Sequence, residues 1–202
     1  MPLTIAILTA VLSYTWLLEP WLGHNVVGIP VAVVAGLGVL NAFRTREWGL
    51  APRALLPGLR AATLFTIPLA AALLAAGAAL GTLHQRGNAL ASFASLFVWG
   101  AAQQWILQTV ILREAQRAST RTTGAIVAAL LFGALHLPNP LLTAITLVGA
   151  LGWCAIYDRY PNLLPLALSH AVGTMILMSA FDDRLIGGLH VGYSYLMLEW
   201  GS

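Results

Sequence analysis

Charge is the scarcest feature of this sequence. Only 8% of the 202 residues are charged, and lysine is absent, so all ten basic residues are arginine. An average soluble domain is about 25% charged, and a soluble fold of this size could not cover its surface with so few charges. The hydrophobic share of 59% and the mean hydropathy of +0.82 indicate a chain whose solvent is lipid.

Cysteine is also nearly absent. Cys154 is the only one, which excludes a disulfide framework, and its apolar surroundings predict a small buried side chain. The net charge of +3 is not clustered on one face, so no nucleic-acid partner is expected. The first 22 residues lack a basic n-region and a clear small-x-small cleavage site, which predicts a retained membrane helix rather than a signal peptide.

Long apolar runs are what the sequence has in abundance. A membrane-spanning helix needs about 20 mostly apolar residues, and seven stretches qualify, some of them marginally. They cover residues 3–22, 26–43, 61–83, 90–112, 123–137, 140–157 and 162–181. We therefore expect an all-α polytopic bundle of about seven membrane helices (six to eight), forming a single integral membrane domain over residues 1–202.

Two other segments have two interpretations each. Arginines alternate with tryptophan and leucine over residues 44–60, which predicts a helix lying on the membrane surface, with an ordinary basic loop as the alternative. The tail from Asp182 to Ser202 is aromatic and punctuated by glycine. It is either an interfacial segment or an eighth, short membrane helix.

The arginines predict an orientation. With seven spans, the end that carries the N-terminus holds eight of the ten, and the opposite end holds Arg86 and Arg184. Because positive residues collect on the cytoplasmic side, we expect an integral membrane protein of the bacterial inner (cytoplasmic) membrane with a cytoplasmic N-terminus. Glu114, near that end, is expected to pair with Arg117 or Arg121.

Polar side chains interrupt three of the predicted spans, where they are costly and therefore candidates for function. Each span has a pair of residues four apart, hence on one helix face. The pairs are Gln104 with Gln108, Phe132 with His136, and His170 with Thr174, and Gln103 adjoins the first. Facing lipid would leave these polar groups unpaired. We therefore expect a polar pocket inside the bundle, lined by Gln103, Gln104, Gln108, His136, His170 and Thr174.

Other interpretations of these residues remain open. Glutamines in membranes often serve only as hydrogen bonds between helices, and single histidines are often structural. His24, His84 and His190 fall in predicted loops or the tail and are interpreted as structural. A further hypothesis makes His136 and His170 axial ligands of a haem or pigment, which a visible absorption spectrum would detect.

The three pairs, in this order, resemble the motifs of the CAAX-protease and bacteriocin-processing family of intramembrane endopeptidases (type II CAAX proteases). That family carries Glu-Glu-x-x-x-Arg on one membrane helix, Phe-x-x-x-His on the next and His-x-x-x-Asn later. Here the second motif is intact, from Phe132 to His136. The first reads Gln103-Gln104-Trp-Ile-Leu-Gln108, and Thr174 replaces asparagine in the third. The similarity covers about residues 90–180.

The resemblance implies an endopeptidase that processes membrane-associated peptides or proteins. Its catalytic positions would be Gln103 and Gln104, which replace the glutamates that activate water, together with His136, His170 and Thr174; Phe132 and Gln108 would support them. Glutamine does not titrate as a base, and loss of a positioned base typically lowers a rate by about 10²–10⁴-fold. With no carboxylate to pair, an arginine in place of Gln108 would itself be unpaired.

Two functions therefore stay open. One is an endopeptidase with impaired catalysis, and the other is a non-catalytic pseudoprotease that acts as a membrane subunit or chaperone. In either case the expected partners are a membrane-associated peptide or the transmembrane helix of another protein, within the lipid bilayer. A divalent metal such as zinc is only weakly supported, because His136 and His170 would be its only strong ligands.

Overall fold

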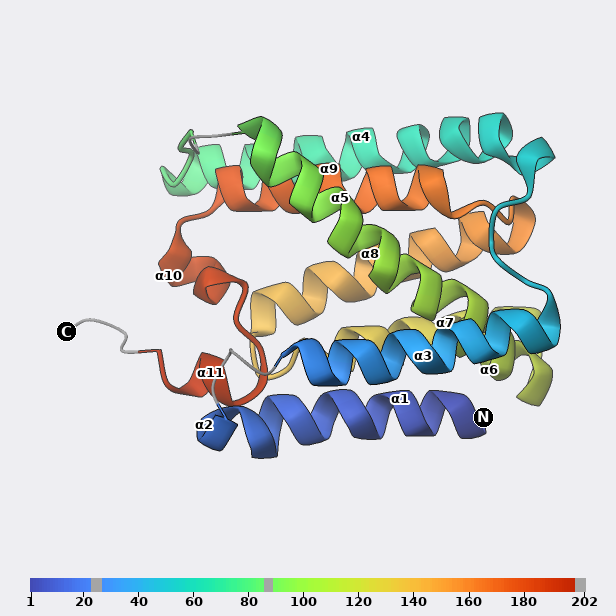
Figure 1. Ribbon diagram of the computed structural model, residues 1–202. Coiled ribbons are helices and arrows are strands. Elements are labelled where there is room, and N and C mark those ends of the chain that lie inside the picture. Colours follow the sequence, from blue (N-terminus) through green and yellow to red (C-terminus); the bar gives the residue numbers. More distant parts are fainter. Residues whose placement is uncertain (23–26, 86–88, 199–202) are drawn as a thin grey trace.

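The computed structural model is built from α-helices and their π and 3₁₀ variants (Figure 1), and it describes residues 1–22, 27–85 and 89–198. No strand forms in these ranges, which confirms the all-α prediction. The elements are α1 (Pro2–Leu12), η1 (Ser13–Leu18), α2 (Glu19–Leu22), α3 (Gly28–Thr45), η3 (Pro52–Ala54), α4 (Leu55–Leu80), α5 (Ala89–Ile106), η4 (Leu107–Leu112), α6 (Arg113–Ala118), α7 (Arg121–Ala134), α8 (Pro140–Arg159), α9 (Leu163–Ala180), α10 (Asp183–Ile186), η5 (Gly187–Leu189) and α11 (Gly192–Leu196).

Every one of the seven predicted spans contains a long helix. Five helical stretches are long and apolar enough to cross a membrane, namely Pro2–Leu22, Gly28–Thr45, Pro52–Leu80, Pro140–Arg159 and Leu163–Ala180. The shorter α7 and the glutamine-bearing α5 are not among these five. Large apolar side chains such as Ile5, Leu64 and Ile67 stay exposed, as side chains that face lipid do. The protein is an integral membrane protein.

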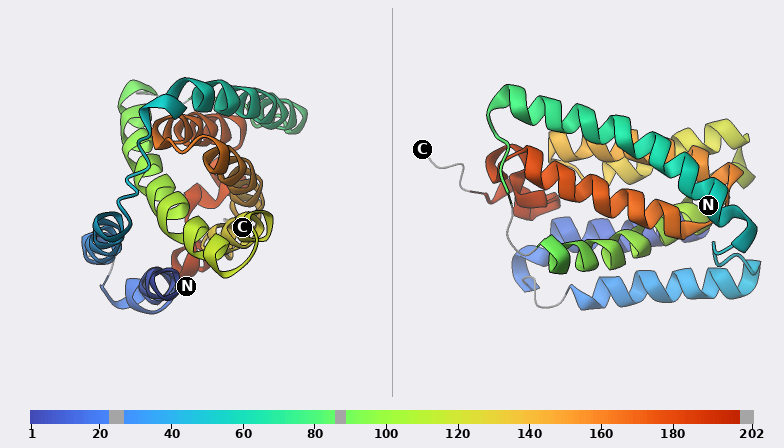
Figure 2. Two further views of the ribbon diagram at one scale, coloured as in Figure 1. Left: turned by 90° about the vertical axis from the view of Figure 1, so that its right-hand side faces the viewer. Right: turned by 90° about the horizontal axis from the view of Figure 1, so that it is seen from above.

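The long helices lie side by side, and α5 runs through the middle of the bundle. Seen end-on, α1 and α3 lie on one side of α5, and α8 and α9 lie on the other (Figure 2). Helix α9 packs against both α4 and α5, and α7 packs against α8. Small residues allow this proximity, since a Cβ on Gly100 of α5 would lie 3.3 Å from Cβ of His170 on α9. The packing of α5 on α9 therefore brings the first and third predicted polar pairs together.

Residues 44–60 do not form the predicted surface helix. Helix α3 ends at Thr45, and positive φ angles at Arg46 and Gly49 turn the chain into a link that lasts until η3. The N–H of Ala51 donates to the carbonyl of Pro161 at 3.2 Å, which fastens this link to the turn between α8 and α9. The alternative of a basic loop is therefore correct for the part between the two helices.

The described part of the tail, residues 182–198, contains no eighth membrane helix. Its longest helix, α11, has five residues, about 7.5 Å of rise, and the apolar core of a bilayer is about 30 Å thick. The tail instead folds against the end of the bundle. There the N–H of Gly192 donates to the carbonyl of Leu137 at 2.8 Å, and the buried Asn139 amide donates to the carbonyl of Ile186 at 2.7 Å.

The ends of α3, α6 and α8 meet the start of α1 at one end of the bundle (Figure 1). Ion pairs join α6 and α7 to α8 and to the segment after α3, because Arg113 contacts Glu47 at 2.7 Å and Asp158 at 3.3 Å, and Arg121 contacts Asp158 at 3.0 Å. The eight arginines predicted to share this end all lie in or beside its helix termini, whereas Arg184 lies at the other end. Arg86 and His24 lie outside the described residues.

The predicted partner of Glu114 is wrong. Glu114 is 9% exposed, and its carboxylate accepts hydrogen bonds from the N–H and hydroxyl of Thr4, both at 2.8 Å, and from the N–H of Leu3 at 3.3 Å. The carboxylate thus caps the first turn of α1, where free N–H groups and the helix dipole favour a negative charge. Burial raises the pKa of Glu114, but these hydrogen bonds outweigh it and lower the pKa below its usual value.

We expect Glu114→Gln to lower the free energy of unfolding at neutral pH by about 1–2 kcal/mol, the usual contribution of a helix cap. Because the folded pKa lies below the unfolded one, this stabilisation is present above the ordinary glutamate pKa of about 4.3 and is lost as the pH falls through the folded value. Unfolding of both proteins in bicelles across this range measures the difference. A difference that persists in acid would contradict a charge-based cap.

Candidate active site

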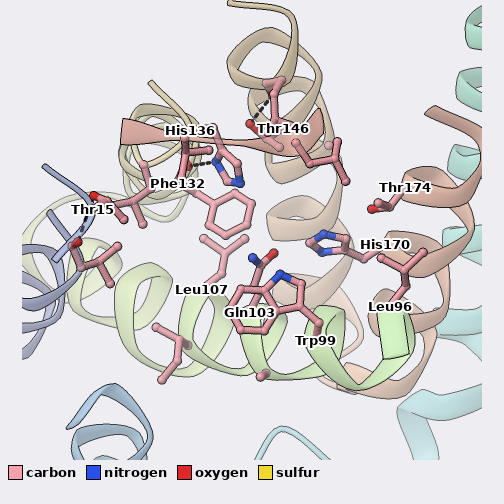
Figure 3. Close-up of a pocket in the computed structure, with 18 of the residues that line it drawn as sticks. Thr15, Leu96, Trp99, Gln103, Leu107, Phe132, His136, Thr146, His170 and Thr174 are labelled. Carbon is pink, nitrogen blue, oxygen red and sulfur yellow. Dashed lines mark hydrogen bonds between the residues drawn. The ribbon is translucent and has the colours of Figure 1, made fainter. Parts of the chain in front are cut away.

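A cavity of about 640 Å³ lies inside the bundle, bounded by α1, α3, α5, α8 and α9. Most of its wall is apolar. Polar side chains at the motif positions line it (Figure 3): Gln103 from α5, His136 from the turn after α7, and His170 and Thr174 from α9. The other polar side chains on its wall are Tyr14, Thr15, Glu19, Thr146, His190 and Ser194. The three motifs, which are far apart in the sequence, therefore meet at one cavity.

The adjacent glutamines of the first motif point in different directions. Gln103 lines the cavity, whereas Gln104 and Gln108 do not line it and are fully buried beside His170. Successive residues of a helix are rotated by about 100°, so the side chains of Gln103 and Gln104 leave α5 in different directions, and that of Gln104 is directed at His170 on α9. The prediction that Gln104 and Gln108 line the pocket is therefore wrong, and they pack in the contact between helices.

A hydrogen-bonded chain runs through this contact. The Gln108 amide nitrogen donates to Oε1 of Gln104 at 3.0 Å, and Nε2 of Gln104 lies 3.2 Å from Nδ1 of His170. Residues 104 and 108 meet because they are one helical turn apart. The chain ties α5 to α9 and fixes one edge of the His170 ring.

Trp153 holds the face of the same ring. Its indole is stacked on His170 with 4.7 Å between the ring centroids and an interplanar angle of 10°. The indole N–H donates to Oγ of Ser169 at 2.9 Å, and that hydroxyl lies 2.6 Å from Oγ1 of Thr66 on α4. Sequence reasoning missed all three residues. The signal that could have indicated Trp153 is that a buried indole N–H requires an acceptor.

The intact second motif places His136 just past the end of α7. Its Nδ1 lies 2.8 Å from the carbonyl oxygen of Phe132. The buried Phe132 ring meets both histidines edge-on, with centroids 5.1 Å from His136 and 6.4 Å from His170. The Phe132 ring therefore packs against both imidazoles and holds them apart on the wall of the same cavity (Figure 3).

Gln103 brings an unsatisfied hydrogen-bond acceptor to the cavity. Oε1 of Gln103 is buried and has no hydrogen-bond partner among the described residues, and a buried acceptor normally finds a donor. Within residues 1–22, 27–85 and 89–198, no three His, Cys, Asp or Glu side chains are grouped to hold a metal ion. Two histidines and amide oxygens are a poor donor set for zinc, so the site does not fit that ion.

Comparison with known families identifies this arrangement. Residues 85–176 match the model of the Rce1-like family, described as type II CAAX prenyl endopeptidases. Residues 85–176, a little under half of the chain, are thus similar to the type II CAAX proteases. The segment contains all three motif pairs, from Gln103 to Thr174. Searches of curated proteins and of solved structures gave no match.

Relative to the motifs of that family, the chain keeps one and alters two. The kept motif, Phe132 and His136, shapes the cavity wall. The altered first motif is divided between the cavity and the α5–α9 contact, and Thr174 lines the cavity one turn beyond His170. One residue or more from each motif thus lines the cavity, with amides where that family has charged groups.

Proposed function

We propose that the protein is an intramembrane endopeptidase that acts on membrane-associated peptides or proteins, with slower catalysis than relatives that carry the glutamate pair. The similarity of residues 85–176 to the type II CAAX proteases supports the reaction class. The observation that carries the proposal is the convergence of Gln103, His136, His170 and Thr174 on one cavity within the bundle.

The wall of the cavity fits an apolar peptide segment. Helices α1, α3 and α5 contribute aliphatic and aromatic side chains, among them Val11, Val34 and Trp99. Ligand sites in proteins combine such walls with a few convergent polar groups. In this one, the unpartnered Oε1 of Gln103 would accept a hydrogen bond from a peptide N–H, and Thr174 would add a hydroxyl.

Proton transfer at this site would fall to a histidine. Among the motif positions only His136 and His170 titrate, since an amide does not act as a base. Glu19 is the one carboxylate on the described cavity wall, but it comes from α2, near Tyr14, and belongs to none of the motifs. A histidine base in place of the glutamate is the reason we expect impaired rather than full activity.

A second function is favoured by the state of the first motif. Gln108 donates to Gln104, and Gln104 bonds to His170, within the contact between helices, so the altered motif stabilises the bundle without any charge. A chain that kept the cavity but needed no catalysis could preserve this arrangement. It would be a pseudoprotease that binds a partner's helix or peptide, as a membrane subunit or chaperone.

We also propose that the protein resides in the bacterial inner membrane with its N-terminus in the cytoplasm. The gathering of eight arginines at the end of the bundle that holds the start of α1 supports this orientation, because positive residues near membrane helices are retained on the cytoplasmic side.

We expect the unmodified protein to cleave a membrane-anchored reporter peptide slowly, and His136→Ala and His170→Ala to lower that rate by about 100-fold or more, because each removes a proton-transfer or oxyanion group. Glu19→Gln is the control and should leave the rate within about twofold, whereas a loss equal to that of the histidine variants would assign the base to Glu19. Cleavage in proteoliposomes, followed by gel, gives the rates.

The quadruple variant Gln103→Glu, Gln104→Glu, Gln108→Arg and Thr174→Asn separates the two functions. If the endopeptidase proposal holds, both it and the unmodified protein cleave, the variant by about 10²–10⁴-fold faster. Cleavage by the variant alone would identify the natural protein as a pseudoprotease.

The orientation is tested with single cysteines in a Cys154→Ala background. Ser119 and His84 are both exposed and lie at opposite ends of the bundle. A membrane-impermeant maleimide added to intact cells should label His84→Cys and leave Ser119→Cys unlabelled. The reverse pattern would place the N-terminus outside the cytoplasm.

A further inference from the structure

Two of the three histidines that line the cavity, His136 and His170, have chemically opposite partners at Nδ1; the third, His190, belongs to none of the motifs. For His136 the partner is the Phe132 carbonyl oxygen, at 2.8 Å. A carbonyl only accepts hydrogen bonds, so Nδ1 of His136 carries the hydrogen. A neutral imidazole has a single N–H, and Nε2 of His136 is therefore a bare acceptor.

For His170 the partner is an amide nitrogen, and a second amide sets which atom is presented. Gln108 donates to Oε1 of Gln104 at 3.0 Å, which occupies that oxygen and directs Nε2 of Gln104 towards Nδ1 of His170, 3.2 Å away. An amide nitrogen only donates. Nδ1 of His170 therefore accepts, and its hydrogen is on Nε2.

The ring of His170 is held against rotation. It is 8% exposed, is stacked on Trp153, and meets the edge of Phe132. In the described structure neither histidine uses Nε2 in a hydrogen bond to the protein, and both side chains line the same cavity. The two Nε2 atoms are thus available to a ligand, one as acceptor and one as donor.

We infer that Gln104 and Gln108 form a positioning pair that sets the tautomer of His170, so that the motif positions supply a histidine base, His136, and a histidine donor, His170, with no carboxylate among them. The inference rests on the proposed endopeptidase function and names how that site works. Neither glutamine contacts the reacting atoms; both act through His170.

The resulting hydrolysis balances. Nε2 of His136 takes a proton from water while the water oxygen forms a bond to the peptide carbonyl carbon, and the displaced electron pair moves to the carbonyl oxygen. The Nε2–H of His170 donates a hydrogen bond to that oxyanion. When the C=O bond reforms, the C–N bond breaks and the leaving nitrogen takes the proton from His136. The products are a carboxylic acid and an amine.

A carboxylate at position 104 would reverse the role of His170. A carboxylate only accepts hydrogen bonds, so it would require the hydrogen on Nδ1 and leave Nε2 bare. The amide at position 104 is therefore a functional difference from a glutamate of the same shape. This contrast gives the inference a spectroscopic test that does not depend on cleavage.

The test is ring-nitrogen NMR of ¹⁵N-histidine-labelled full-length protein in bicelles at neutral pH, with signals assigned from His136→Phe and His170→Phe. We expect the Nδ1–H tautomer for His136 and the Nε2–H tautomer for His170. Gln104→Glu should move the hydrogen of His170 to Nδ1 and leave His136 unchanged. Gln85→Glu, at an exposed position, is the matched control and should change neither.

The second variant, Gln108→Leu, frees the Gln104 amide to rotate, so His170 should show a mixture of both tautomers; a pure Nε2–H signal there would overturn the role of Gln108. An Nδ1–H signal for His170 in the unmodified protein would overturn the whole inference, since it would mean that both amides are reversed. The expected tautomers in a protein that cleaves no peptide would support the tautomer assignment and overturn only the endopeptidase proposal.

Discussion

The hydrogen bond between Gln104 and His170 is the interaction on which the rest of the site depends. It joins α5 to α9 inside the bundle, it is backed by Gln108, and both glutamines are fully buried. Inside a membrane protein no bulk water is available to hydrogen-bond these amides, so their partners must come from the protein. Hydrogen bonds of this kind between membrane helices contribute about 0.6–2 kcal/mol each. The bond also decides which edge of the His170 ring faces the cavity. The same interaction therefore stabilises the bundle and sets which ring nitrogen a ligand would meet.

Amides in place of charged groups affect the stability of the bundle and the chemistry of the site differently. A buried carboxylate and arginine must be stripped of water, and their attraction has to offset that penalty. The amides of Gln104 and Gln108 avoid the penalty and keep the shape of the contact. The chemistry is altered more, because the proton acceptor of the first motif is gone and the histidines remain. The chain therefore keeps the three motif positions around one cavity while the first motif carries no titratable group.

Local patterns in the sequence were enough to predict the helices. Apolar runs and paired prolines are short-range signals, and each predicted span corresponds to a helix. The i, i+4 polar pairs indicated which helices carry the site. The orientation of α5 about its own axis could not be predicted from the sequence, because packing against α9 decides that Gln103 faces the cavity and Gln104 does not.

Other features depended on contacts between distant segments. The partner of Glu114 is Thr4, 110 residues earlier in the chain, and no spacing rule indicates such a pair. Trp153 lies in an apolar helix and touches His170 only after α8 and α9 fold together. The link near Gly49 is shaped by its contact with the α8–α9 turn, whereas its composition alone left a surface helix and a basic loop both open.

A double-mutant cycle on the free energy of unfolding in a bilayer, measured for Gln104→Leu, His170→Phe and the double variant, tests directly whether these two side chains hold α5 to α9. If the two side chains hold α5 to α9, the coupling energy should be about 0.6–1.7 kcal/mol. The cycle of Gln103→Leu with His170→Phe should give a value near zero, since the structure shows no bond between Gln103 and His170 within the described residues. A coupling energy of zero between Gln104 and His170 would mean that this hydrogen bond does not hold α5 to α9.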